Sequence, residues 1–315
     1  MYSLEKLTAN EWSQLGVLFL EVFGHTLDPA LANFKYEIGR GESLALLDED
    51  GEIVAHCGMI FRDLLDAGIP APGVQFGDLM VAPNVRGILS RQGLPFYQVF
   101  TGALRRVNAS QIKPLVFGFP SDRATRLGER LDVIAKVDQV MELTWPKSQE
   151  PLHAVAQTEA GERFRSVLNW LWKKMAKDLG NAVVGVRDAE YFVRRYFNHP
   201  IHEYSVYLMR SSWLKRPLGV FVLRRLGPVV ELVDWVAPMA GGLQVIEQAR
   251  RAAAQLGGER LITWLAQSYS QKLMVGALSC QQLEICVALA GTLAVERVSQ
   301  YKGRMWITSG DTDYH

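Results

Sequence analysis

One arrangement of residues occurs twice in this chain and constrains its fold more than any other feature. Residues 80–87 read MVAPNVRG, and residues 235–242 read WVAPMAGG. Each stretch follows a strand-like run of apolar residues and precedes an amphipathic helix. After each helix comes a second strand, whose apolar residues are typical of a buried strand. Because the order of elements matches while the two sequences are only weakly alike, the chain is predicted to contain two similar α/β halves.

The first half is expected to alternate strands and helices. Its predicted elements are a helix at 8–23, strands at 43–47, 53–62 and 74–81, a helix at 95–107, a strand at 114–119, a helix at 121–130 and a strand at 134–143. Thr8 and Glu11 have the spacing of a capping box, and Ser121 or Asp122 is the expected cap of the last helix. This order indicates the α/β class, with a mixed sheet and flanking helices.

A polar stretch with two prolines, residues 145–157, separates this half from a helix predicted at 162–177. We therefore expect a first domain at 1–145, a connecting region at 146–199 and a second domain at 200–315. The connecting helix combines an apolar stripe with basic residues and two tryptophans. That combination suits either a helix packed between domains or one that lies on a membrane surface.

Charge and composition exclude several classes of protein. The chain has 34 basic and 33 acidic residues, and its net charge of +1 gives no electrostatic argument for a nucleic-acid partner. No apolar run is long enough for stable membrane insertion, and no signal peptide is visible. Cys57, Cys280 and Cys286 suit a reducing compartment and lack metal-ligand spacing. We expect a cytoplasmic protein without a metal site.

Residues 75–106 run from a strand through a loop with two arginines into a helix. Such a loop offers backbone N–H groups and the positive end of a helix dipole to a phosphate or pyrophosphate. The pattern Val81-x-Pro83-x-x-Arg86-Gly87 resembles the central strand end and donor loop of the GNAT superfamily of N-acyltransferases, specifically its tandem-domain members. Residues 119–131 and 186–200 are more weakly similar to further segments of that family.

The resemblance implies two GNAT-like domains, each with a mostly antiparallel sheet, and direct attack of an amine on an acyl-CoA. Since the second copy has no arginine in its loop, the donor is expected on the first domain, at Met80, Val81, Arg86, Gly87, Arg91, Gly93 and Ser121. The simplest expectation is an N-acetyltransferase that moves the acetyl group of acetyl-CoA, or another acyl group, to a small polar amine such as an amino sugar. A monomer and a homodimer both remain open.

Two departures from the family pattern keep a second interpretation open. Residues 88–92 lengthen the loop between Arg86 and Gly93, and Gly128 stands where the family commonly has the tyrosine that protonates the departing thiolate. The alternative is a non-catalytic protein, built on a duplicated acyltransferase fold, that binds CoA or serves as a scaffold.

Asp78 is the candidate catalytic residue. Strand alternation predicts Phe76, Asp78 and Met80 on one face, so Asp78 is an acidic group on a largely apolar strand. It is either a general base or amine anchor, or the partner of an arginine in a structural ion pair. Glu231 and Asp234 lie on the matching strand of the second copy, and either is a candidate for lining a substrate cleft.

Two further features each have an ordinary structural explanation. His56 lies on an apolar strand and is expected to be a hydrogen-bonded core histidine. The C-terminal tail, residues 310–315, is expected to fray, as chain ends commonly do. In some tandem members of the resembling family the C-terminal carboxylate points into the active site, so a functional tail is the alternative.

Overall fold

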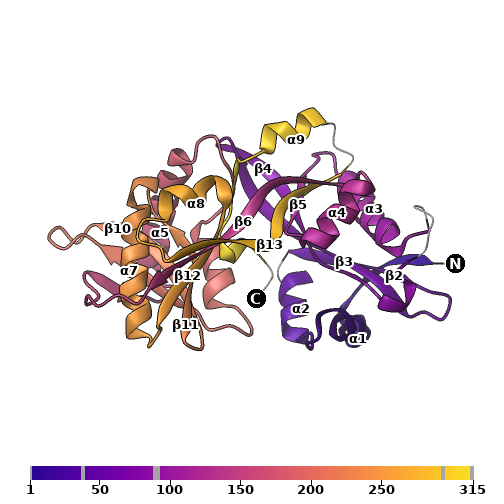
Figure 1. Cartoon of the computed structure of the whole chain (residues 1–315), viewed down its shortest axis with the longest axis horizontal. Coiled ribbons are helices and arrows are strands. Elements are labelled where there is room, and N and C mark those ends of the chain that lie inside the picture. The colour runs from indigo at the N-terminus through magenta and orange to yellow at the C-terminus, as the bar shows by residue number, and fades with distance from the viewer. Residues whose placement is uncertain (1, 37–39, 88–92, 292–294, 313–315) are drawn as a thin grey trace. The chain divides into compact units, whose positions relative to one another are not determined.

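The structure of the chain is a computed structural model, which describes residues 2–36, 40–87, 93–291 and 295–312. Its contacts divide the chain into two compact units (Figure 1). Unit 1 comprises Met1–Asp63, Ala71–Val137 and Val287–Gln300, and unit 2 comprises Leu64–Pro70, Asp138–Cys286 and Tyr301–His315. In each unit helices cover a mostly antiparallel sheet, which confirms the predicted fold class.

Unit 1 is built mainly from the N-terminal half of the chain. Its elements are β1 (Ser3–Leu7), η1 (Ala9–Glu11), α1 (Trp12–Phe23), α2 (Pro29–Tyr36), β2 (Gly41–Leu47), β3 (Ile53–Asp66), β4 (Ile69–Val81), η2 (Pro83–Val85), α3 (Pro95–Asn108), β5 (Leu115–Gly118), α4 (Asp122–Arg130) and the start of β6 (Ile134–Pro146). The expected capping box of Thr8 and Glu11 is present, and Ser121 caps α4 by accepting a hydrogen bond from the Ala124 N–H. Two elements of this unit, β1 and α2, were not predicted from the sequence.

The sheet of unit 1 has helices on both faces. Its strand order is β1-β2-β3-β4-β5-β13-β6, where β13 (Ser279–Ala290) comes from the far end of the chain. The first three strands are antiparallel neighbours, whereas β4 and β5 are parallel. One face packs against α1 and α2 around Trp12, Leu15 and Met80, and the other packs against α3 through Phe100 (Figure 1).

Unit 2 contains most of the C-terminal half. Its elements after β6 are β7 (Val155–Gln157), α5 (Glu162–Asp178), β8 (Val183–Gly185), α6 (Ala189–Phe192), η3 (Val193–Phe197), β9 (Ser205–Arg210), β10 (Pro217–Leu226), β11 (Val229–Val236), η4 (Met239–Gly241), α7 (Gly242–Gln255), β12 (Arg260–Ala266), α8 (Gln267–Leu273), β14 (Met305–Trp306) and η5 (Ser309–Asp311). The short helix α9 (Val295–Tyr301) lies near the end of the chain, and its last residue is in unit 2.

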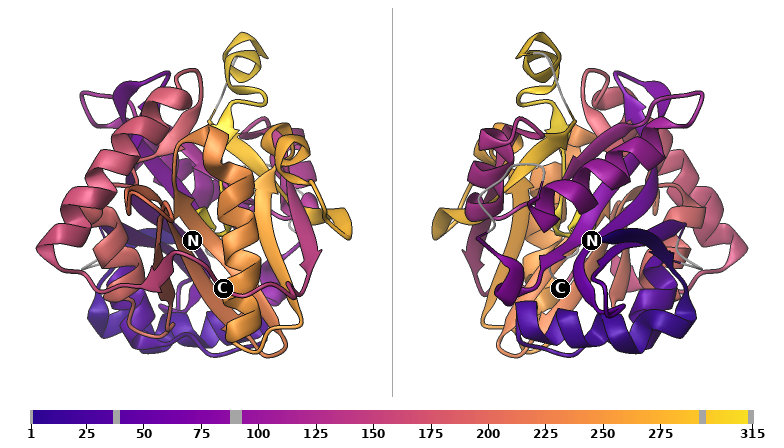
Figure 2. Two further views of the ribbon diagram at one scale, coloured as in Figure 1. Left: turned by 90° about the vertical axis from the view of Figure 1, so that its left-hand side faces the viewer. Right: turned by 90° about the vertical axis from the view of Figure 1, so that its right-hand side faces the viewer.

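The sheet of unit 2 has the strand order β6-β12-β11-β10-β9-β7. Helices α5 and α7 both run along β10 and β11 (Figure 2). The predicted apolar stripe of α5 is buried in the core of this unit, and Trp172 is buried with it, while Trp170 is exposed. The helix is therefore a core element of unit 2.

The predicted duplication is visible in the order of the elements. Val81 ends β4 and Val236 ends β11, and each is followed by a single 3-10 turn, a long helix and a strand parallel to the one before the turn. Each central strand is also irregular three residues before its end. In β4 the irregularity is the positive φ of Asp78, and in β11 it is a register shift at Val233. The two halves therefore share topology and a local backbone defect.

Each half of the chain also supplies a strand to the other unit. The long strand that follows α4 is β6, and it pairs with β12 of unit 2 from Val140 to Pro146. The corresponding strand after α8 is β13, whose Ala288 and Leu289 pair with β5 of unit 1. The division between the units falls inside both strands. The ranges of the two units are therefore not continuous in the sequence.

Candidate functional site

In unit 1 the pairing between the two central parallel strands ends partway along β4. β5 pairs with β4 from Leu115 to Gly118, opposite Gly73 to Phe76, while β4 continues to Val81. A Cβ at Gly118 would lie 2.8 Å from the carbonyl oxygen of Phe76, so only glycine allows this close approach. Beyond Phe76 β4 continues without this partner, because β5 ends at Gly118.

The backbone of β4 reverses its alternation where the strands separate. Asp78 has φ of +45°, in the left-handed region that non-glycine residues rarely occupy. Phe76 packs edge-on against Phe100 of α3, whereas Met80 lies in the core formed by α1 and α2 on the other face. The prediction that Phe76, Asp78 and Met80 share one face is therefore wrong, because the irregular residue shifts the two-residue period.

Asp78 is held by two neighbouring residues of α2. Lys35 Nζ lies 3.2 and 3.1 Å from the two carboxylate oxygens, and the Tyr36 hydroxyl donates to Oδ2 at 2.5 Å. Burial raises the pKa of Asp78, but the Lys35 charge and the Tyr36 hydrogen bond outweigh it and leave the pKa below its usual value. The expected ion-pair partner is thus a lysine rather than an arginine.

The main chain of the same residue is fixed by a buried histidine. His56 Nδ1 lies 2.7 Å from the carbonyl oxygen of Asp78, and its Nε2 lies 2.7 Å from the hydroxyl of Ser43. Burial lowers the pKa of His56, so the neutral ring donates from Nδ1 to the carbonyl and accepts from Ser43 at Nε2. The expectation of a hydrogen-bonded core histidine is confirmed.

The predicted phosphate loop follows β4. Arg86 is exposed, and its guanidinium donates to the carbonyl oxygen of Val81 at 2.9 Å from Nε and 2.7 Å from Nη2. Gly87 has φ of +108°, which favours glycine, and Gly93 lies two residues before α3. Arg91 lies outside the described residues. The side chain of Arg86 is therefore positioned at the end of β4, beside the loop that leads into α3.

The remaining predicted donor residues differ in accessibility. Met80 is buried in the core, so only its main chain can line the separated edge of β4. Ser121 lies at the start of α4, directly after β5. At Gly128 a Cβ would come within 2.4 Å of Ile134, so this position has no room for the tyrosine common in the resembling family.

Unit 1 also contains a cavity of about 600 Å³ beside Tyr36. Its size lies within the usual range for sites that hold small molecules. Charged side chains of both signs line it together with two aromatic rings, and the lining residues are Lys6, Leu7, Thr8, Tyr36, Arg40, Gly41, Glu42 and Phe61. Because Tyr36 also binds Asp78, this side chain connects the cavity to the irregular residue of β4.

In unit 2 the pairing between the corresponding strands also ends early, and a segment of the chain lies between the two strands. β11 pairs with β12 from Val229 to Glu231, opposite Arg260 to Ile262, and both strands then continue. Thr308 forms an isolated bridge with Leu265, and Ser309 Oγ accepts a hydrogen bond from the Trp264 N–H at 3.0 Å. The crevice between β11 and β12 is thus filled by Thr308–Thr312.

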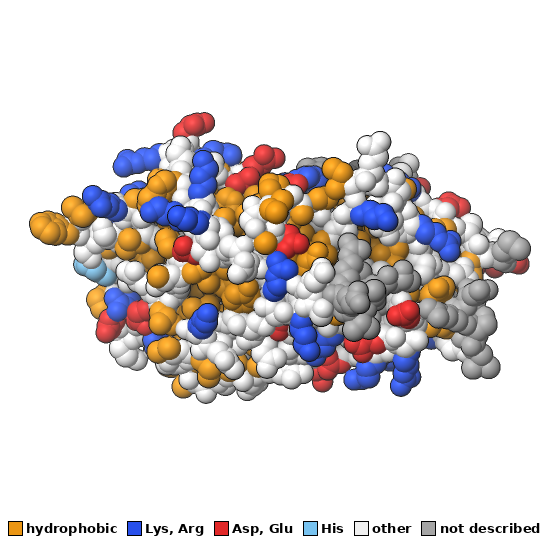
Figure 3. Space-filling model, turned by 90° about the horizontal axis from the view of Figure 1, so that it is seen from above, with side chains coloured by type: hydrophobic (Ala, Val, Ile, Leu, Met, Phe, Trp, Pro, Cys, Tyr) orange, Lys and Arg blue, Asp and Glu red, His pale blue; other side chains and the backbone are white. Residues whose placement is uncertain are grey.

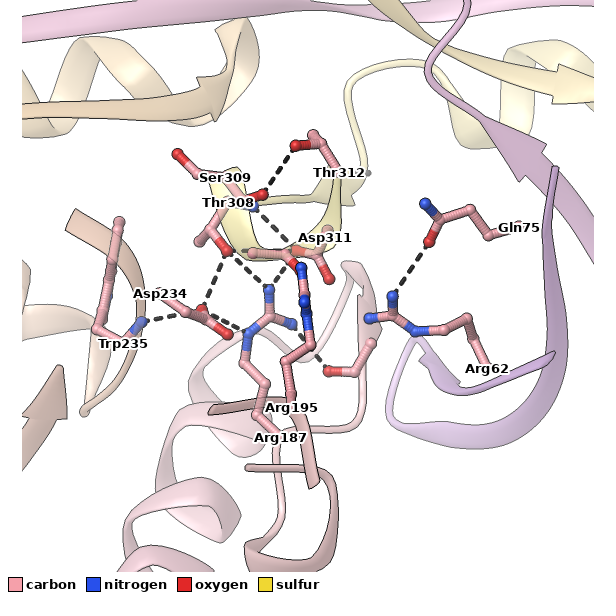
Figure 4. Close-up of polar contacts among 12 residues, drawn as sticks. Arg62, Gln75, Arg187, Arg195, Asp234, Trp235, Thr308, Ser309, Asp311 and Thr312 are labelled. Atoms are coloured by element: carbon pink, nitrogen blue, oxygen red, sulfur yellow. Dashed lines mark hydrogen bonds and ion pairs between the residues drawn. The ribbon is translucent and has the colours of Figure 1, made fainter. Parts of the chain in front are cut away.

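A buried ionic cluster holds this segment in place (Figure 4). Arg187 binds Asp234 at 2.9 Å and also binds Asp311, while the Tyr196 hydroxyl donates to Asp234 at 2.8 Å. Thr308 Oγ1 donates to the same carboxylate at 3.0 Å. Burial alone would lower the pKa of Arg187, but the two carboxylates raise it above its usual value, so the guanidinium stays charged.

Three expectations about the second half are corrected by these contacts. Asp234 is fully buried against Arg187, and Glu231 is fully buried against Arg224 at 2.6 Å, so neither lines an open cleft. The tail does not fray at its start, because Ser309 to Thr312 are buried. Residues 313–315 lie outside the described part of the chain.

Sequence reasoning missed Lys35, Tyr36 and Ser43, which complete the surroundings of Asp78 and His56. Tyr36 and Lys35 lie on α2, whose start has a recognisable signal, since Asp28 Oδ1 accepts from the Ala30 N–H at 2.7 Å and Pro29 is the first helical residue. Among the described residues no group of three potential metal ligands occurs, and no helix is long and apolar enough to cross a membrane.

Comparison of sequences identifies no relative, because no family model and no curated protein matches the chain. Solved structures do match. A protein of Enterococcus faecalis described as a probable N-acyltransferase superposes with a TM-score of 0.68 at 12% identity, over 93% of this chain and 73% of that one. A GCN5-related N-acetyltransferase of Kribbella flavida gives 0.65 at 14%, over 92% and 70%.

N-myristoyltransferase of Saccharomyces cerevisiae, solved with bound myristoyl-CoA and inhibitors, also superposes on this chain. Its TM-score is 0.59 at 10% identity, and the match covers 96% of this chain and 85% of that one. These superpositions confirm the predicted GNAT-type fold. The superposed region includes residues of both units of the chain.

Proposed function

We propose that the chain is an acyl-CoA-dependent N-acyltransferase that binds its donor in unit 1. The observation that carries this proposal is the part of β4 beyond Phe76, which no longer pairs with β5 and contains the irregular residue Asp78. Unit 2 is not proposed as a donor site, because Thr308–Thr312 occupy the corresponding crevice.

The pyrophosphate of the donor would lie against the loop that leads into α3. The N-terminus of a 14-residue helix carries backbone N–H groups and a partial positive charge. Arg86 lies at the start of this loop with Gly87, and Gly93 lies at its end. We propose Arg86 and Arg91 as the cationic contacts, with the main chain of Met80 and Val81 along the acyl-bearing part of the donor. We also propose Ser121, at the start of α4, as a residue that contacts the donor.

The acceptor is proposed to be a small polar amine, and the cavity beside Tyr36 is proposed as its entry. Its mixed charges, including the carboxylate of Glu42, suit a polar molecule rather than an acyl chain. Asp78 would serve as an anchor for the ammonium group or as the acceptor of its proton, through the Tyr36 hydroxyl. The lowered pKa of Asp78 keeps the carboxylate ionised at neutral pH. Of the two roles, this favours that of an anchor for the ammonium group.

One observation favours the second candidate function, a CoA-binding protein without catalysis. Gly128 packs against Ile134, so no side chain at this position can protonate a departing thiolate. In that case the donor site would bind CoA while the chemistry is absent.

Two measurements separate these functions. CoA and acetyl-CoA are first added to the whole chain during thermal unfolding, and a ligand at 100 times its Kd raises the free energy of unfolding by about 2.7 kcal/mol. Release of free thiol is then followed with a panel of amines and with acetyl and longer acyl donors. Stabilisation with turnover supports the acyltransferase, and stabilisation without turnover on any amine supports the CoA-binding protein. No stabilisation by either ligand contradicts both.

A further inference from the structure

Two hydrophobic residues that are adjacent in the sequence are exposed in the turn between β9 and β10. Trp213 is 91% exposed, the most of any large hydrophobic side chain in the described residues, and its neighbour Leu214 is 60% exposed. Figure 1 shows the β10 end of this hairpin projecting from unit 2 on the left of the view. An exposed tryptophan at the tip of a hairpin is an unfavourable arrangement in water and points to a contact that covers it.

The tip is held in shape by hydrogen bonds of its own. The Ser211 N–H donates to the Arg216 carbonyl at 2.8 Å, and the Lys215 N–H donates back to the Ser211 carbonyl at 3.1 Å. The Ser211 hydroxyl accepts a further bond from the Arg216 N–H at 3.0 Å. Trp213 and Leu214 are therefore exposed on a turn that is closed by its own hydrogen bonds.

The charge of this hairpin has one sign. Residues 205–226 contain five basic residues and no acidic one, in a chain whose net charge is only +1. Arg224 is used in the buried pair with Glu231, but Arg210, Lys215 and Arg216 lie at the tip, where the Arg210 guanidinium donates to the Lys215 carbonyl at 3.1 Å. Figure 3 shows hydrophobic side chains with Lys and Arg side chains beside them at the left end of the view.

We propose that the β9–β10 hairpin is a peripheral docking element for the anionic surface of a lipid bilayer. Tryptophan is favoured at the boundary between headgroups and acyl chains, where its ring is buried and its N–H stays hydrated. Leu214 adds apolar area, while Arg210, Lys215 and Arg216 face the negatively charged headgroups. This contact is independent of the proposed acyltransfer, because the tip lies in unit 2 and the donor site in unit 1.

The size of the tip favours a lipid surface over a protein partner. A stable protein interface buries about 800 Å² on each partner and uses about 20 to 30 residues of each. The exposed tip comprises only residues 212–216, with two apolar side chains. A bilayer needs no matching shape and accepts a short apolar tip with a basic rim.

The first test is sedimentation of the whole chain with vesicles of phosphatidylcholine and phosphatidylglycerol in equal parts. We expect binding to these vesicles and at least tenfold weaker binding to vesicles of phosphatidylcholine alone. Trp213→Ser with Leu214→Ser should weaken binding about tenfold or more. The matched control is Ile69→Ser with Ile112→Ser, since each isoleucine is 69% exposed elsewhere on the chain, and this variant should bind as the unmodified chain does.

The second test separates charge from apolar contact. Lys215→Gln and Arg216→Gln should each weaken binding to the anionic vesicles about fivefold at low salt, and raising the salt should reduce this difference. The fluorescence of Trp213 is the emission that the Trp213→Phe variant lacks. Brominated phosphatidylglycerol should quench this part of the emission of the unmodified chain.

Three results with vesicles would overturn the proposal. The unmodified chain does not sediment with anionic vesicles, or the serine variant binds them as tightly as the isoleucine control, or binding is equal for neutral vesicles. Sedimentation velocity tests the alternative that a second copy of the chain binds the tip. If the unmodified chain forms a stable dimer that the serine variant loses, the tip is an interface between copies of the chain and the lipid proposal fails.

Discussion

The side chain of His56 binds the main chain of Asp78 and not its carboxylate. The imidazole Nδ1 lies 2.7 Å from the Asp78 carbonyl oxygen, while the Asp78 carboxylate binds Lys35 and Tyr36. One residue with a left-handed backbone is thus fixed from two sides, by β3 through its carbonyl and by α2 through its side chain. This double attachment holds the irregular point of β4 in place.

Replacing His56 is expected to destabilise unit 1 and to change its response to pH. His56→Ala leaves the Ser43 hydroxyl and the Asp78 carbonyl without their partner, at about 1–3 kcal/mol each. In the folded chain the pKa of His56 is lowered, whereas in the unfolded chain it is about 6.5. As the pH falls below about 6.5 only the unfolded chain binds this proton, so the free energy of unfolding decreases. Urea unfolding at about pH 7.5 and about pH 5.5 should show a smaller pH effect in the variant. An equal pH effect in both proteins would exclude this role of His56.

Asp78→Asn is expected to leave the chain folded and able to bind CoA but to lower turnover by roughly 10²–10⁴, because the neutral amide can neither anchor the ammonium group by its charge nor take its proton. Steady-state rates and CoA titration of the same preparation check both parts. Asp50→Asn is the control, because Asp50 is an exposed carboxylate of unit 1 in the turn between β2 and β3. Full turnover of the Asp78 variant, or its unfolding, would assign Asp78 a purely structural role.

Arg86→Ala is expected to weaken CoA binding by about 1–3 kcal/mol, the worth of a charge-assisted contact to phosphate. Arg86→Lys should recover part of this loss, because it keeps the charge but not the paired donation to the Val81 carbonyl. Titration calorimetry measures each variant beside Lys113→Ala, which removes an exposed charge elsewhere in unit 1. If the Arg86→Ala and Lys113→Ala variants bind CoA equally well, the donor assignment to this loop is wrong.

Each chain is expected to bind one molecule of CoA. The crevice of unit 2 holds Thr308–Thr312, and at Gly310 a Cβ would already lie 2.2 Å from the Tyr196 hydroxyl oxygen, so no space remains for a second donor. The stoichiometry from calorimetry checks this. Two equivalent sites per chain would show that the segment leaves its crevice in solution.

Arg187→Met is expected to destabilise unit 2 by about 3–5 kcal/mol, the usual result of removing one member of a buried ionic group. Both Arg187 and Asp234 are 0% exposed, and the methionine would leave two buried carboxylates without their cation. Lys173→Met, at an exposed position of α5, should stay within about 0.5 kcal/mol of the original chain. Urea denaturation measures both. A loss below about 1 kcal/mol would mean that water or rearrangement compensates the cluster.

The parts of the fold that the sequence predicts are those determined by local signals. The strand, Ala-Pro turn and helix around Val81 and Val236, and the caps at Thr8 and Ser121, depend on residues a few positions apart. The faces of β4 could not be predicted, because the reversal at Asp78 depends on Lys35, Tyr36 and His56, which are distant in sequence.

The same reason explains the errors about the second half. Asp234 looked like a residue of an open cleft because its partners Arg187 and Thr308 lie 47 and 74 positions away. The burial of Ser309 to Thr312 likewise depends on contacts with β12, which no signal within a polar tail can indicate. Of the candidate site, the sequence identified Asp78 and the Arg86 loop but not the residues that surround them.

The strand contributed by β13 has a consequence for how the protein is made. Unit 1 includes Val287–Gln300, so its β5 edge remains incomplete while the ribosome is still translating the second half. At about 5–20 residues per second, the nascent chain waits roughly 7–30 s between emergence of β6 and of β13. During that interval the unpaired edge of β5 is open to wrong partners, and a fragment that ends near residue 146 would keep this exposed edge permanently.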